Sequence, residues 1–115
     1  MPALAHLPAP GELAWLRDEA GLRPPAIARL LGVAPDAYAR WCTGAWAPTP
    51  ADVPMLPAVT ALYARARATM PEQRTRTRWW VEGQREVGWL SPAELLRRGK
   101  VGEVLLLIGA ADGEA

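Results

Sequence analysis

Proline and glycine punctuate this chain so often that no long helix or strand can run through it. The 115 residues include 12 Pro and 10 Gly. Proline lacks a backbone donor and breaks helix interiors, while glycine favours turns and helix ends. The intervening segments are rich in Ala and Leu and show little β-type alternation, so the sequence predicts an all-α fold. We expect about seven short helices over residues 12–20, 24–31, 35–42, 58–69, 72–82, 92–99 and 101–110.

The composition indicates a soluble globular protein, with 50% hydrophobic and 22% charged residues. The longest aliphatic run, Val104–Ile108, is far shorter than the roughly 20 residues that span a bilayer. The first residues lack the pattern of a signal peptide, and the one cysteine, Cys42, excludes an internal disulfide. We therefore expect a cytoplasmic protein with no membrane partner.

Few residue types suited to catalysis are present. The sequence has one His and one Cys, whereas a zinc site needs about four ligands. A Ser-His-acid arrangement would depend on His6, which falls in a Pro/Ala-rich leader over residues 1–11. The glycines are scattered singly, so there is no phosphate-binding loop. We expect no enzyme activity, no metal and no cofactor.

The net charge of +1 hides a basic stretch in the second half of the chain. Within residues 65–78 a single acid, Glu72, stands against the arginines at 65, 67, 74, 76 and 78. Such a density of positive charge is typical of a surface that meets phosphate or an acidic partner. A solvated helical face is an equally good interpretation.

Residues 22–44 read LRPPAIARLLGVAPDAYARWCTG, which has the spacing of a helix-turn-helix. A small residue in the first helix lets the second cross closely, and a glycine four positions later permits a left-handed turn. The segment resembles the lambda-repressor-like Xre class, whose pattern is met by Ala28, Gly32, Val33, Arg40, Trp41 and Gly44. Tyr38 and Trp41 are expected to point inward.

This resemblance implies that the second helix of the pair reads DNA. The expected DNA-binding residues are Arg23, Asp36, Ala37, Arg40 and Thr43. Of these, Arg40 has the donors that suit a guanine edge or a phosphate, whereas the Asp36 carboxylate repels phosphate. The polar residue that usually starts the first helix of the pair and holds a phosphate is replaced by Pro24 or Pro25. The usual Ser or Thr that caps the second helix is replaced by Ala34. A helix-turn-helix kept for packing or protein contact is therefore the alternative.

Residues 79–113 read WWVEGQREVGWLSPAELLRRGKVGEVLLLIGAADG. Within them, Ser91-Pro92-Ala93-Glu94 is typical of a helix start, with Ser as N-cap, Pro in the first turn and Glu placed to reach back to the Ser91 amide. The segment resembles the toxin-binding domain of Xre/MbcA/ParS-type antitoxins. The matching residues are Trp79, Pro92, Leu95, Leu96, Gly99, Val104, Leu105 and Ile108.

The antitoxin resemblance implies two parts, a helix-turn-helix domain over residues 12–69 and toxin-binding helices with a tail over 70–115. It implies that the protein binds operator DNA and covers the active-site cleft of a RES-domain toxin that degrades NAD. A homo-oligomer is also expected. The expected toxin-binding residues are Trp80, Trp89, Arg97, Arg98, Lys100, Val101, Leu105, Ile108, Asp112, Gly113 and Glu114.

Two further expectations concern the apolar residues of this half. Trp79 is expected in the core, with Trp80 or Trp89 nearer the surface. The helix over 101–110 is apolar around much of its circumference, so one stripe should remain for a partner.

The alternative function is a stand-alone transcriptional repressor whose C-terminal helices only dimerise.

Overall fold

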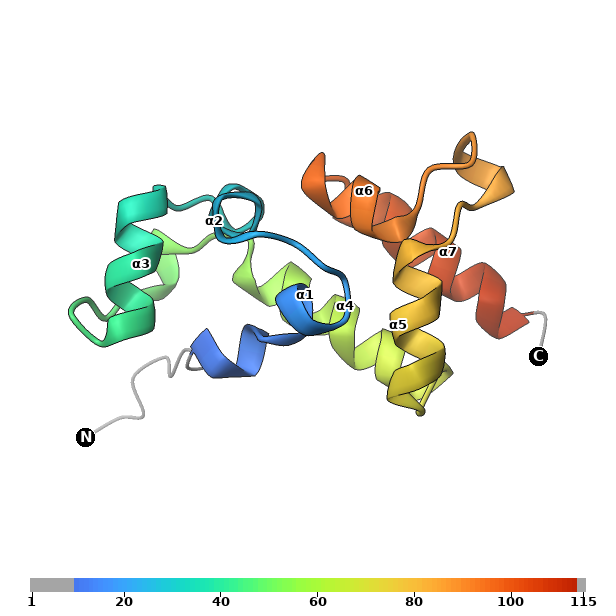
Figure 1. The fold of residues 1–115 in the computed structure, drawn as a ribbon, viewed down its shortest axis with the longest axis horizontal. Coiled ribbons are helices and arrows are strands. Elements are labelled where there is room, and N and C mark those ends of the chain that lie inside the picture. The colour runs from blue at the N-terminus through green and yellow to red at the C-terminus, as the bar shows by residue number, and fades with distance from the viewer. Residues whose placement is uncertain (1–9, 114–115) are drawn as a thin grey trace.

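The computed structural model describes residues 10–113, which form seven α-helices joined by short loops and 3-10 turns (Figure 1). The helices are α1 (Trp15–Asp18), α2 (Pro24–Leu31), α3 (Pro35–Thr43), α4 (Leu56–Thr69), α5 (Gln73–Val81), α6 (Pro92–Arg97) and α7 (Val101–Gly113). The 3-10 turns are Pro10–Leu13, Pro50–Asp52 and Arg85–Val87. Residues 10–113 contain no strand, only an isolated bridge between Gln84 and Leu90, so the all-α prediction is confirmed. Most of the leader predicted over residues 1–11, including His6, lies outside the described residues.

Proline and glycine set the helix boundaries as expected. A proline occupies the first turn of α2, α3 and α6, where its missing N–H costs nothing. Gly32 and Gly44 end α2 and α3 with φ angles of 80° and 82°, in the left-handed region that glycine adopts without strain. The helix predicted over 12–20 is the main departure. Only Trp15–Asp18 is α-helical there, and the 3-10 turn Pro10–Leu13 precedes it.

The predicted start of α6 is half correct. The Ser91 hydroxyl accepts a hydrogen bond from the Glu94 backbone N–H at 3.1 Å, as an N-cap should. The Glu94 carboxylate does not return to the Ser91 amide. It instead accepts from Arg97 at 3.3 Å and from Arg98 at 3.4 Å, because these arginines follow one turn later on the same helix face.

One hydrophobic core runs through the whole described chain. Figure 1 shows α2 and α3 on one side of the molecule and α5, α6 and α7 on the other, with α4 running between them. Helix α4 packs against α7, and α2 packs against both α3 and α6. The largest fully buried side chains come from both predicted parts: Leu16, Leu22, Leu31, Leu62, Trp80, Leu95, Leu96 and Ile108. The buried side chains before and after residue 70 therefore pack into one core.

The longest described helices, α4 and α7, have 14 and 13 residues. Among residues 10–113, none is long and apolar enough to cross a membrane.

Candidate DNA and partner interfaces

Helices α2 and α3 form a helix-turn-helix with the packing that the sequence predicts. Ala28 is completely buried at the crossing, and its carbonyl accepts a hydrogen bond from the Val33 N–H at 2.9 Å, which closes the turn. Tyr38 and Trp41 point inward from α3, with their rings edge to face at 6.3 Å. These contacts fix the angle between the two helices and leave the other face of α3 to solvent.

The outer face of α3 carries the residues expected to contact DNA. Asp36, Arg40 and Thr43 are exposed, and Ala37 is half-buried. The Arg40 guanidinium lies 3.3 Å from the Asp36 carboxylate in an exposed pair one turn apart. Such a surface pair contributes about 0–1 kcal/mol, so Arg40 is easily released to another anion. Arg23, also exposed, is the N-cap residue of α2.

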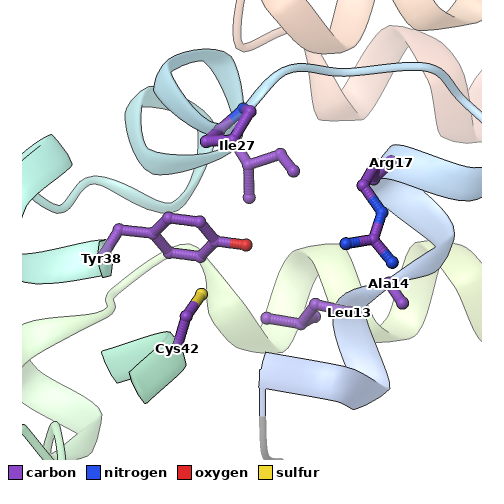
Figure 2. Close-up of a pocket in the computed structure, with 7 residues that line it drawn as sticks. Leu13, Ala14, Arg17, Ile27, Tyr38 and Cys42 are labelled. Atoms are coloured by element: carbon purple, nitrogen blue, oxygen red, sulfur yellow. The ribbon is translucent and has the colours of Figure 1, made fainter. Parts of the chain in front are cut away.

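A hollow of about 260 Å³ is lined by α2, by α3 and by Leu13, Ala14 and Arg17. Figure 2 shows the Tyr38 hydroxyl and the Arg17 guanidinium directed toward one another across it, with the Cys42 thiol beside the ring. Burial, together with the Cys42 thiol, raises the pKa of Tyr38 to about 12. The hydroxyl therefore stays protonated at neutral pH and supports α3 as a neutral group.

A buried polar network joins the end of α1 to α4 and α5, and sequence reasoning missed it. Glu19, which follows α1, and Arg76 of α5 are 5% and 6% exposed. Arg76 donates from Nε to Glu19 Oε1 at 3.1 Å and from Nη2 to Oε2 at 3.3 Å. The Tyr63 hydroxyl donates to Glu19 Oε2 at 2.6 Å, and the Trp80 indole N–H donates to Oε1 at 3.2 Å.

The network satisfies every charge and donor that it buries. Arg76 also donates to the backbone carbonyls of Met70 and Pro71, at 2.9 and 2.8 Å. Burial raises the pKa of Glu19, but the hydrogen bonds from Arg76, Tyr63 and Trp80 outweigh it and hold the pKa below its ordinary value. The same pairing raises the pKa of Arg76. Both groups are therefore charged at neutral pH.

This network corrects the interpretation of the basic stretch over residues 65–78. Arg76 is a structural residue with an internal counter-charge, and neither a solvated face nor a phosphate contact describes it. The other four arginines of the stretch, at positions 65, 67, 74 and 78, are exposed. No local signal could have found the pairing, because Glu19 and Arg76 are 57 positions apart.

The residues expected to bind a toxin fall into three groups. Trp80, Val101 and Ile108 are buried in the core, because their helix faces pack inward, so they cannot meet a partner directly. Leu105 is half-buried, whereas Trp89, Arg97, Arg98 and Lys100 are exposed. Asp112 and Gly113 end α7, but the surroundings of Asp112 and all of Glu114 lie outside the described residues. Trp79 is in the core, as predicted.

The loop that carries Trp89 is tightly closed. The Gln84 N–H donates to the Leu90 carbonyl at 2.9 Å, and the Trp89 N–H donates to the Gln84 carbonyl at 2.8 Å. Trp89 has a φ of 69°, which non-glycine residues seldom adopt, and its side chain is 69% exposed. Only glycine fits at position 83, since a Cβ there would lie 2.5 Å from the Trp89 carbonyl oxygen. Hydrogen bonds thus hold a strained tryptophan toward solvent, a kind of strain that concentrates at functional sites.

Helix α7 presents an exposed face centred on Leu106, which is 76% exposed. Gly102, Glu103, Gly109 and Ala110 are exposed at helical spacing around it. The sequence predicts that one stripe stays open, but Leu106 itself was not expected there. Five consecutive apolar residues give no periodic signal for which of them faces out, and the packing of α7 on α4 decides it.

The described residues offer no metal site, since nowhere in 10–113 do three His, Cys, Asp or Glu residues converge. What this part of the chain does present is an exposed outer face of α3 and, in the C-terminal half, large apolar side chains that are exposed.

These features define a helix-turn-helix protein with an added C-terminal helical layer. Residues 11–74 match the helix-turn-helix domain family, and because they make up more than half of the chain, the protein belongs to that family. No curated protein matches the sequence. The fold is similar to a chain in the crystal structure of the M. tuberculosis MbcT-MbcA toxin-antitoxin complex, with a TM-score of 0.57 and 23% sequence identity. That likeness covers 90% of this chain and 92% of the other, so the shared fold includes both halves.

Proposed function

We propose that this protein is an antitoxin that binds and blocks a RES-domain, NAD-degrading toxin and also represses its own operon by binding DNA. The observation that carries the proposal is the extent of the structural likeness. The helix-turn-helix match ends at residue 74, whereas the likeness to a chain of a toxin-antitoxin complex extends over the C-terminal helices as well. A helix-turn-helix alone would not account for those helices.

The surface of the C-terminal half supports a protein partner. Trp89 and Leu106 expose large apolar side chains, which are favourable anchors when a partner removes them from water. Burying one such side chain contributes about 1.5–3 kcal/mol. The exposed cations Arg98 and Lys100 lie just after α6, where they can orient an acidic partner surface.

Blocking a toxin in this way requires steric cover and no chemistry. The exposed apolar side chains Trp89 and Leu106 suit a contact that closes an active-site cleft. The acidic end of the chain, with Asp112 and Glu114, is proposed to pair with the cationic groups that hold the phosphates of NAD in the toxin.

The test is co-expression with a RES-domain toxin encoded in the same operon, with growth and cellular NAD as readouts. Trp89→Ala and Leu106→Glu should each weaken protection. Ala61→Glu, an exposed site on α4, is the matched control for an added charge on a helix surface and should protect fully. Truncation after Gly109 should weaken protection through loss of the acidic end. Full protection by both surface variants, with unchanged helicity in circular dichroism, would refute the C-terminal assignment.

The alternative is a repressor whose C-terminal helices only dimerise. The same exposed Leu106 favours it, because an apolar helix face also suits a second copy of the chain. Light scattering separates the two functions. If the alternative holds, Leu106→Glu converts a dimer to a monomer. In that case neither the unmodified protein nor any variant protects cells from the toxin.

A further inference from the structure

A second hollow, of about 290 Å³, lies between α2 and α6 and gathers arginines from both halves of the chain. Its lining residues are Gly21, Arg23, Pro25, Ala26, Arg29 and Arg97. We call it the arginine hollow. Arg23 and Arg29 belong to the helix-turn-helix, whereas Arg97 comes from the last turn of α6. No acidic residue lines it.

The three guanidinium groups carry more positive charge than the fold neutralises. Among the described residues, Arg23 and Arg29 form no ion pair, and Arg97 shares the single carboxylate of Glu94 with Arg98. All three arginines are exposed, so none has the internal role that Arg76 has. Like charges held together in a concave surface create a positive potential that favours an anion.

The N-terminus of α2 borders the arginine hollow through Arg23 and Pro25. The start of a helix attracts phosphate through its free backbone amides. Pro24 and Pro25 occupy the first turn of α2 and remove two of those donors. Arg23 precedes the helix, and Arg29 lies one turn beyond Pro25 on the same face. The Arg23 guanidinium thus supplies donors at the end where the prolines remove them, and Arg29 lines the hollow from the last turn of the same helix.

We propose that the arginine hollow binds a backbone phosphate of the DNA on which α3 lies, with Arg97 contributing a contact from the C-terminal half. The proposal rests on the DNA binding stated under Proposed function. DNA is favoured over an acidic protein because two of the three arginines belong to the helix-turn-helix and α2 packs directly on α3. Arginine forms paired hydrogen bonds with phosphate oxygens, which fix a protein on the duplex without reading its sequence.

Salt dependence of DNA binding tests the proposal, because each phosphate contact contributes about 0.9 to the slope of log affinity against log salt concentration. The full-length protein, Arg97→Ala and Arg85→Ala are titrated by fluorescence anisotropy against two unrelated short duplexes. Arg85 is the matched control, an exposed arginine in the turn Arg85–Val87 away from the hollow. Arg97→Ala should lower the slope by about 0.9 on both duplexes, which is about a 3.5-fold smaller loss of affinity between 50 and 200 mM salt. Arg85→Ala should keep the original slope.

An unchanged slope for Arg97→Ala overturns the arginine hollow as a phosphate site. Arg40→Ala in the same titration reports on the recognition helix separately. If Arg40→Ala weakens binding while Arg97→Ala has no effect, DNA binding stands and the hollow does not. If Arg97→Ala loses affinity only for the toxin, the hollow faces a protein and the proposal is overturned. If the unmodified protein binds neither duplex, the hollow and the DNA-binding part of the proposed function fail together, and toxin protection is judged by its own assay.

Discussion

Replacing Glu19 with leucine should destabilise the entire chain. The carboxylate accepts 4 hydrogen bonds, from Tyr63, Trp80 and two nitrogens of Arg76. Its removal leaves the Arg76 guanidinium 6% exposed and without a counter-charge. Breaking a buried ion pair by removing one partner costs about 3–5 kcal/mol. That is a large share of the roughly 5–15 kcal/mol by which native domains are stable.

Urea unfolding, followed by tryptophan fluorescence and by circular dichroism, measures this loss. For a urea dependence of about 1.5 kcal/mol per molar, a loss of 3 kcal/mol lowers the unfolding midpoint by about 2 M. Asp18→Asn serves as the control, because that carboxylate is exposed and pairs only with its neighbour Arg17. It should change the midpoint little, since exposed pairs contribute about 0–1 kcal/mol.

The double variant Glu19→Leu with Arg76→Met separates the pair from its surroundings. With both charges gone, no buried charge is left unpaired, so the double variant should be more stable than Glu19→Leu alone. The single variant Arg76→Met completes the comparison. If the losses of unfolding free energy in Glu19→Leu and Arg76→Met add in the double variant, the reasoning is refuted. A loss of less than about 1 kcal/mol in Glu19→Leu would refute it as well.

Acid should reveal the same pair. The pKa of Glu19 in the folded state lies below its unfolded value of about 4.3, so its contribution is present above that pH and is lost as the pH falls through the folded pKa. The unmodified protein should therefore lose stability in this range more steeply than the double variant. Equal slopes for the two proteins would show that Glu19 is not held ionised.

Three other substitutions test local features. Gly83→Ala should lower the melting temperature and weaken toxin binding, because its Cβ would lie 2.5 Å from the Trp89 carbonyl oxygen. Gly102→Ala, which meets nothing within 4 Å, is the control for stability and should not lower the melting temperature. Ser91→Ala should cost about 1 kcal/mol in urea unfolding by removing the N-cap of α6, and Ser91→Asp should retain most of that stability. Arg40→Ala should lose about 1–3 kcal/mol of specific binding in gel shifts on the protein's own promoter, and an unchanged affinity would show that α3 does not read bases.

Local signals were enough to predict most of the helices after α1, because their ends depend on single residues. Pro24, Gly32 and Gly44 define α2 and α3 by backbone geometry that no distant contact has to supply. The inward positions of Tyr38 and Trp41 follow from the helical period, and both are confirmed. The candidate DNA surface is therefore the part of the site that could be predicted from sequence.

The partner surface could be predicted only in part, because it depends on which faces the core covers. Trp80 and Trp89 are alike in sequence, yet Trp80 is buried against Trp15 with ring centroids 5.1 Å apart, while Trp89 is exposed. In the same way, the packing of α7 on α4 buries Ile108 and leaves Leu106 open. Both outcomes are decided by contacts between segments that are far apart in the chain.

Those long-range contacts also decide how the two proposed functions can be tested separately. A fragment of residues 1–70 keeps Glu19 and Trp15 but loses Arg76 and Trp80, so it leaves a carboxylate without its counter-charge and an aromatic face without its cover. It also removes α7 from the apolar face of α4. Such a fragment should be unfolded in circular dichroism, and its failure to bind DNA or a toxin would then say nothing about either surface. Point variants at Trp89, Leu106 and Arg40 avoid this difficulty, because each changes an exposed side chain and leaves the shared core intact. A cooperative melting transition for residues 1–70, close to that of the full chain, would contradict this view of one core.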